Sequence, residues 1–249
     1  MRLIASLVAA AVVAAPSAAL ADTVPPDPAP GGPQRPYEAD VAGPDNLDTL
    51  TAAVTPDAGR SVTVELDRRS RTASGVMSAA ARRFVFLFDR SLTLNPDAFP
   101  VCARTVIEAS GPGACPGGSR VGGGVGTSFG GQETEVLVFN TRIGRLRGVL
   151  VVFPASGVIL EQTLERAAAP YRGSYRWALD EIIPPNATPP GQRAGNARFR
   201  LWFGATRMER GRAVGFVERR HPAKVLRFGL WSEFVTGQVV LPQWQTLSP

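Results

Sequence analysis

One serine motif in the sequence has the residue types for catalysis. Residues 126–130 (GTSFG) match the G-x-S-x-G pattern that presents the nucleophile Ser128, and Asp180 and His221 follow it in the order of a hydrolase triad. That motif needs a core strand leading directly into a helix, because the serine hydroxyl is held on a strained turn. Here glycines surround the motif and neither element is evident. We therefore expect no serine-hydrolase site.

Paired carboxylates are a second catalytic option, because the two acids of a glycosidase need only meet in space. Most of the available acids are expected at the surface: Glu161, Glu165, Asp180, Glu181, Glu209, Glu218 and Glu233. A phosphate-binding loop is not expected, because Val225 follows the only lysine, Lys224. His221 is the only histidine, which argues against zinc. The sequence thus predicts no cofactor and no metal.

Two aromatic residues are candidates for facing a ligand. Trp202 and Trp231 each fall on the more polar face of an alternating segment. Exposed together, they would form a stacking platform for sugars, whereas core or half-buried sheet positions are the commoner use of tryptophan.

Positive charge is carried almost wholly by arginine, and the formal net charge is +6. The arginines are spread along the chain, which is typical of a solvated β-surface, and an anionic cell-envelope polymer is the alternative interpretation. No clustered basic helix or reader motif indicates nucleic acid.

The N-terminus has the pattern of a secretory leader. Arg2 precedes an apolar run, and Ala19-Leu20-Ala21 forms an A-x-A cleavage site, so we expect residues 1–21 to be a signal peptide. Residues 22–46 are rich in proline and glycine and predict a disordered lead-in. The remaining domain, 47–245, is expected outside the cytoplasm, secreted or associated with the cell envelope, with no transmembrane segment after cleavage.

Short β-rich runs separated by turn residues predict an all-β fold. We expect a single antiparallel β-sandwich or jelly-roll-like domain with at most one or two short helices, at 105–109 or 161–168. Strands are predicted at 61–66, 84–88, 91–94, 133–139, 148–153, 158–164, 171–183, 197–203, 213–218, 225–234 and 238–241. Residues 84–88 (FVFLF) are expected to be buried on both faces.

The chain is organised around residues 99–124, which hold Cys102, Cys115 and the densest glycine run. Two cysteines in an exported chain predict one disulfide, Cys102–Cys115. Closing a loop of about 14 residues should stabilise the fold by roughly 3 kcal/mol in the chain-entropy model. Two free thiols or a metal-binding pair are the alternatives. We expect a clamped connector that leaves through a flexible glycine run.

Residues 98–102 (AFPVC) and 111–124 (GPGACPGGSRVGGG) resemble an FP-x-C…CP-x-G-S-x-V-G-x-G element of exported actinobacterial proteins of uncharacterised function. A G-x-Y stretch follows at 173–175. The resemblance implies a secreted all-β protein and supplies no catalytic residues. Many members carry further cysteines near the last strands, and this chain has none there.

Together these patterns favour a secreted, non-enzymatic β-module with a binding or structural role at the cell envelope or outside the cell. A hydrolase acting on envelope polysaccharide or lipid is the first alternative, so the question of enzymatic activity stays open. A carbohydrate- or lipid-binding module, with an aromatic face or an inter-sheet cavity, is the second. The expected partner is an envelope glycan, lipid or protein.

Overall fold

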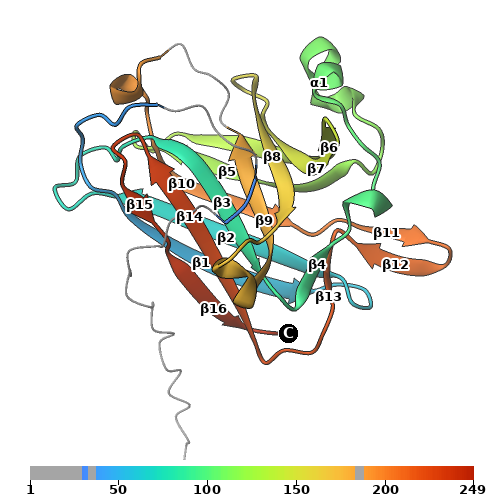
Figure 1. The fold of residues 1–249 in the computed structure, drawn as a ribbon. Helices are drawn as coiled ribbons and strands as arrows, with labels where there is room; N and C mark the ends of the chain where they lie inside the picture. The colour runs from blue at the N-terminus through green and yellow to red at the C-terminus, as the bar shows by residue number, and fades with distance from the viewer. Residues whose placement is uncertain (1–29, 33–37, 183–187) are drawn as a thin grey trace, which may run out of the picture.

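One large antiparallel sheet forms most of the molecule (Figure 1). The computed structural model describes residues 30–32, 38–182 and 188–249. The expected leader, 1–21, and residues 22–29 and 33–37 of the expected lead-in lie outside the described residues. Residues 38–46 of that lead-in are described and pack beside the sheet, where Val41 N donates to Val235 O at 3.0 Å.

The elements follow one another along the chain in this order: β1 (Leu47–Pro56), β2 (Val62–Arg71), β3 (Ala81–Asp89), β4 (Leu92–Leu94), η1 (Pro96–Ala98), α1 (Arg104–Ser110), η2 (Pro112–Ala114), β5 (Arg120–Ser128), β6 (Glu133–Ile143), β7 (Leu146–Phe153), β8 (Val158–Arg166), η3 (Tyr171–Gly173), β9 (Tyr175–Ile182), η4 (Pro190–Gln192), β10 (Asn196–Phe203), β11 (Thr206–Glu209), β12 (Arg212–Gly215), β13 (Val217–Arg219), β14 (Val225–Phe234), β15 (Val239–Val240) and β16 (Gln243–Leu247).

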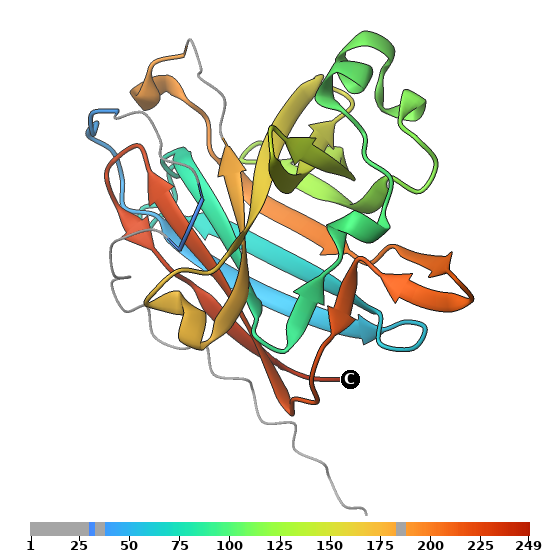
Figure 2. The ribbon, with the colours of Figure 1, turned by 45° about the vertical axis from the view of Figure 1, so that its right-hand side comes forward.

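The sheet has the strand order β1-β2-β10-β5-β6-β7-β8-β9-β3-β14-β15, and β16 also pairs with β14. It curls until β16 lies against β1, which produces a nearly closed barrel (Figures 1 and 2). Two short two-stranded sheets lie outside this path: the hairpin β11–β12, and β4 paired with the distant β13. The expected all-β antiparallel class is confirmed.

Side chains alternate between the barrel interior and its outer wall, as strand geometry requires. On β10, Phe199, Leu201 and Phe203 point into the main core, and β14 contributes Leu226, Phe228 and Leu230. Both alternations agree with the sequence pattern. The expected two-sided burial of 84–88 is nearly complete, with Phe84 alone partly exposed.

Two satellite clusters cover the outer wall. One places Val85, Leu87 and Trp231 under the β8–β9 connection and the segment before β16. The other packs Cys102 and Ile107, from the segment around α1, against the outer faces of β6, β7 and β8. Figure 2 shows α1 and its flanking turns on that side of the barrel.

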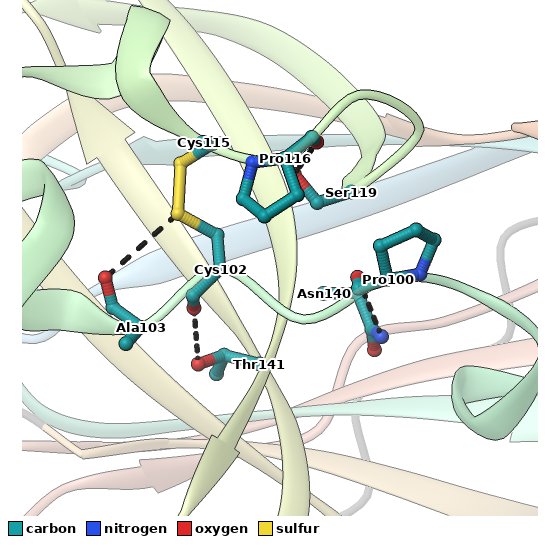
Figure 3. The surroundings of a disulfide bond; sticks show 8 residues. All are labelled: Pro100, Cys102, Ala103, Cys115, Pro116, Ser119, Asn140 and Thr141. Atoms are coloured by element: carbon teal, nitrogen blue, oxygen red, sulfur yellow. Dashed lines mark hydrogen bonds between the residues drawn. A yellow bond between two sulfur atoms is a disulfide. The ribbon is translucent and has the colours of Figure 1, made fainter.

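The predicted disulfide joins Cys102 and Cys115, which lie 13 residues apart. Asn140 and Thr141 of β6 anchor the clamped segment (Figure 3): the Thr141 hydroxyl donates to Cys102 O at 2.7 Å, and Cys102 N donates to Asn140 O at 2.9 Å. The Asn140 amide also donates to the carbonyls of Pro96 and Phe99, both at 2.9 Å. Helix α1 lies inside the clamp, so the helix expected at 105–109 is confirmed.

Two expectations for local structure are wrong. Residues 158–166 form β8 between β7 and β9, so no helix forms at 161–168. The glycine run is not a flexible connector, because 120–128 forms the central strand β5 between β10 and β6. A Cβ on Gly122 would lie 2.1 Å from Trp202 O, and one on Gly124 would lie 2.0 Å from Arg200 O. These glycines therefore allow β10 to approach β5 closely.

Side chains close the seam of the barrel. Asn46, just before β1, accepts at Oδ1 from Ala79 N at 2.8 Å and donates through Nδ2 to Ala79 O at 2.9 Å. Its backbone N–H donates to Gln238 Oε1 at 2.7 Å, and Gln238 Nε2 donates to Asn46 O at 3.1 Å. Asn46 thus links β1 to the loop before β3 and to the turn after β14.

Replacing Asn46 should open this seam. Asn46→Ala removes both bonds to Ala79 and leaves two backbone groups of that residue unpaired, so we expect a loss of about 2–4 kcal/mol in unfolding free energy. Urea unfolding followed by tryptophan fluorescence measures it. Asn196→Ala is the matched control, because the Asn196 side chain is exposed. An equal, small change in both variants would contradict the role of Asn46.

Candidate functional site

A cavity of about 420 Å³ opens at one end of the barrel. At this end β2, β7 and β9 finish and β3, β8 and β10 begin. The rim comes from the segments that cross this end before β3 and before β10. We call it the mouth cavity, and it is lined by Arg68, Ala79, Ala80, Ala81, Phe84, Phe153, Ser156, Val158, Leu160, Glu181, Thr188, Gln192, Arg193, Ala194, Gly195 and Asn196.

The inner wall of the mouth cavity is apolar. Phe84, Phe153 and Leu160 pack on the barrel core. Phe153 stacks on the Phe199 ring, with centroids 6.0 Å apart and planes 16° apart. A Cβ on Gly126 would lie 3.2 Å from Phe153 Cε1, so the absence of a side chain there leaves room for the ring. This wall suits the apolar part of a ligand.

A buried arginine faces the same cavity. Arg68 Nε donates to Asp48 Oδ2 at 2.7 Å, and the side chains are 3% and 0% exposed respectively. Arg68 Nη1 donates to Asn196 O at 3.2 Å, and the guanidinium lies 4.7 Å from the centroid of the Phe84 ring. The Ser70 hydroxyl donates to Asp48 Oδ1 at 2.6 Å. Contacts on several sides therefore fix the orientation of Arg68.

This geometry leaves part of the guanidinium available. Arg68 Nη2 donates to no residue that the structure describes, although Nε and Nη1 are both engaged. A guanidinium held by two of its nitrogens can offer the third to a carboxylate or similar oxygen without losing its orientation. The second arginine of the lining, Arg193, uses all three nitrogens to bind Glu38 and the Thr188 carbonyl. The cavity thus combines an apolar wall with one cation, Arg68, that is both positioned and available.

A second charged side chain, that of Glu181, lines the opposite wall of the cavity. Glu181 is 4% exposed and lines the cavity, and Gln162 Nε2 donates to its Oε2 at 3.4 Å. Gln162 Oε1 is buried and accepts no hydrogen bond from the described part of the chain. Buried acceptors of this kind are commonly satisfied by ordered water or by a ligand.

The rim is held by ion pairs. Arg193 donates to both carboxylate oxygens of Glu38, at 2.9 and 2.6 Å, and Arg82 Nε lies 3.3 Å from Glu38 Oε2. The hydrogen bond from Arg193 is the main cause that holds the pKa of Glu38 below its ordinary value. Residue 38, from the expected disordered lead-in, thereby fixes the loop before β10.

The residues of the serine motif are not brought together. Ser128 ends β5 at the mouth, where its Oγ accepts from Gln132 N at 3.2 Å in the turn to β6. His221 lies between β13 and β14, at the opposite end of the barrel. Asp180 is bound to Arg83, whose Nε donates to Oδ1 at 2.9 Å. No triad forms from these three residues.

The acidic residues considered for a glycosidase pair are also dispersed over the structure. Glu181 is the one acid among the described residues that line the mouth cavity, and its neighbour Asp180 belongs to the other face of β9. Glu218 sits at the far end, near Arg60 and Arg212. In the described ranges, no group of three His, Cys, Asp or Glu side chains could hold a metal ion.

The two tryptophans do not form a shared exposed face. Trp231 is 3% exposed and lies in the outer cluster with Val85 and Leu87. Trp202 is half-buried on the outside of β10, with the Arg120 guanidinium 5.9 Å from its ring centroid. A sugar-stacking platform built on this pair is therefore not present.

The sequence did not predict Arg68 or Glu181 as residues of a shared site, although the pattern of β2 does indicate that Arg68 is buried. Val62, Val64 and Leu66 alternate with period two, and the same period places Arg68 and Ser70 on the buried face. A charge on the inner face of a strand is a candidate functional or paired residue.

Searches against family models, curated proteins and solved structures find no match to this chain. Among the described residues, no helix has the length and apolar character to cross a membrane.

The buried ion pair gives a direct test of the site's construction. Arg68→Met leaves the Asp48 carboxylate buried without its cation, so we expect a loss of about 3–5 kcal/mol in unfolding free energy. The double variant Arg68→Met/Asp48→Leu should recover much of that loss, because it removes both charges. Guanidinium chloride unfolding at neutral pH measures both. A loss under about 1 kcal/mol in Arg68→Met would contradict a buried pair.

Proposed function

We propose that this protein is an extracytoplasmic binding module whose mouth cavity takes a small amphipathic ligand. The apolar part of the ligand packs on Phe84, Phe153 and Leu160, and its anionic or polar end meets Arg68. The observation that carries the proposal is this pairing of an apolar wall with the fixed guanidinium of Arg68, which keeps one nitrogen available, in a cavity of about 420 Å³. Ligand cavities of this size and composition are common in the mouths of β-barrels.

Two features favour binding over catalysis. Arg68 is held by Asp48 and Asn196, so it serves as a fixed recognition group rather than a group that moves protons. The described lining holds one carboxylate, Glu181. A hydrolase acting on polysaccharide by two acids would need a second carboxylate there.

A lipid-like ligand fits better than a glycan. Sugars are usually recognised by exposed aromatic faces, and Trp231 is buried while Trp202 lies on the outer wall. Phenylalanine and leucine side chains offer no hydrogen bonds to hydroxyl groups. The alternative of a lipid-binding cavity, which the sequence left open, therefore has the stronger support.

The disulfide indicates an oxidising, extracytoplasmic environment. Secretion through the predicted leader and association with the cell envelope are part of our proposal. The resemblance of the cysteine segment to exported actinobacterial proteins agrees with this location and remains a prediction.

Blocking the mouth tests the proposal. The neutral probe N-phenyl-1-naphthylamine should bind saturably with increased fluorescence, and dodecanoate should displace it. Val158 lies at the mouth and is 45% exposed, so Val158→Trp should fill the entrance and weaken binding of both compounds about tenfold.

Val225→Trp is the matched control, because Val225 also begins a strand, is 39% exposed and lies at the far end of the barrel. It should bind both compounds as the unmodified chain does. Equal affinities in the two variants would show that the mouth cavity is not the binding site. Displacement by dodecanol as effective as that by dodecanoate would remove the role given to Arg68.

A further inference from the structure

A second depression, of about 560 Å³, lies at the end of the barrel opposite the mouth. It forms between the β3–β4 turn, the end of β8, η3, the start of β9 and the β13–β14 connection. Arginine dominates its lining, and no acidic residue is among the described lining residues. We call it the arginine pocket, after Arg90, Arg166, Arg172, Arg176 and Arg220.

None of these five guanidinium groups forms an ion pair or donates a hydrogen bond within the described ranges. Arginines elsewhere on the surface behave differently. Arg142 and Arg147 share the carboxylate of Asp97, and Arg198 donates to both oxygens of Asp67. A single exposed arginine can be explained as a charge solvated by water. That explanation does not account for five arginines without ion pairs, from five segments, that line the same depression.

Arg176 is the strongest indication of a missing partner. Its Nε is buried and has no hydrogen-bond acceptor in the described chain. Burial is the main cause that lowers the pKa of the Arg176 guanidinium, and the positive charges of Arg166 and Arg220 lower it further. Like charges are thus held close together around a buried donor, an arrangement that an anion would stabilise.

The backbone fixes the positions of these arginines. Arg90 N donates to Ser174 O at 3.1 Å, and Arg220 N donates to Ser91 O at 2.7 Å. The Arg176 carbonyl accepts from Ala167 N at 3.1 Å, and the Arg166 guanidinium lies 4.0 Å from the Trp177 ring centroid. The segments are therefore tied to one another, so binding need not first assemble them.

We propose that the arginine pocket binds a multivalent oxyanion, namely a phosphate group. Guanidinium forks match tetrahedral phosphate oxygens with paired hydrogen bonds, and a doubly charged anion offers acceptors to several arginines at once. A lipid headgroup and a free phosphate compound present the same chemistry. This inference goes beyond the proposed function and does not depend on it, since the two sites lie at opposite ends of the barrel.

The experiment uses the full chain and two sources of phosphate. Titration calorimetry with inorganic pyrophosphate tests the free anion, and flotation with phosphatidylglycerol vesicles tests the headgroup, with phosphatidylcholine vesicles as the reference. Arg176→Gln/Arg220→Gln should weaken binding at least about tenfold. Arg71→Gln/Arg145→Gln is the matched control, because it removes the same charge from exposed residues outside the pocket.

Binding of pyrophosphate that is lost in the pocket variant and kept in the control supports a site for free phosphate compounds. Binding of phosphatidylglycerol alone, with the same dependence on the variants, supports a headgroup site. Equal weakening in both double variants would show that overall charge is responsible and would overturn the proposal. If neither pyrophosphate nor phosphatidylglycerol vesicles bind near physiological salt, the proposal is also overturned. Thermal unfolding monitored by circular dichroism confirms that each variant is folded.

Discussion

The closure of one wide sheet on itself is the constraint on which the structure depends. A sheet edge exposes unpaired backbone groups, and curling hides both edges at once. Here the strands do not complete the ring by pairing, and the Asn46 amide, together with Gln238, joins the two sides. Because Ala79 both pairs with Asn46 and lines the mouth cavity, the same amide closes the wall and positions part of the rim. The closure of the barrel and the geometry of the mouth cavity therefore depend on the same side chain, Asn46.

The barrel wall separates two kinds of environment. Its interior is packed with aromatic and aliphatic side chains, and the buried charge of Arg68 is paired there with Asp48. At the far end, the arginines that line the arginine pocket have no acidic residue among the described lining, although Glu218 pairs with Arg60 and Arg212 nearby. One end therefore offers an apolar cavity with one available guanidinium, that of Arg68, and the other offers positive charge on a polar surface. The two ends are suited to different chemical groups.

Period-two alternation in the sequence was enough to predict the all-β class and most strands, because strands such as 197–203 and 225–234 separate buried from exposed residues cleanly. The disulfide was predicted from the two cysteines and the expected export of the chain. Strand β5 was not predicted, because glycine has no side chain whose polarity could alternate along a strand. The glycines of β5 instead allow β10 to approach closely. Residues 161–164 were predicted both as part of a strand and as part of a short helix, and pairing with β7 and β9 makes them a strand. Glu181 and the arginine pocket depend on contacts between distant segments, which no local pattern encodes, whereas the period-two pattern of β2 does place Arg68 on a buried face. Trp231 was misplaced as a ligand-facing candidate because a second layer covers the outer wall.

The disulfide-clamped segment has a consequence for the order of folding. Its anchors on β6 follow it closely in the chain, so 96–153 contains the clamp, α1 and a three-stranded meander in one continuous stretch. Short loops close at low entropic cost and contacts near in sequence form fastest. Asn46 and Gln238, in contrast, are 192 residues apart. We expect the clamped meander to act as an early folding nucleus, with oxidation of the cysteines possible long before the two margins of the barrel meet.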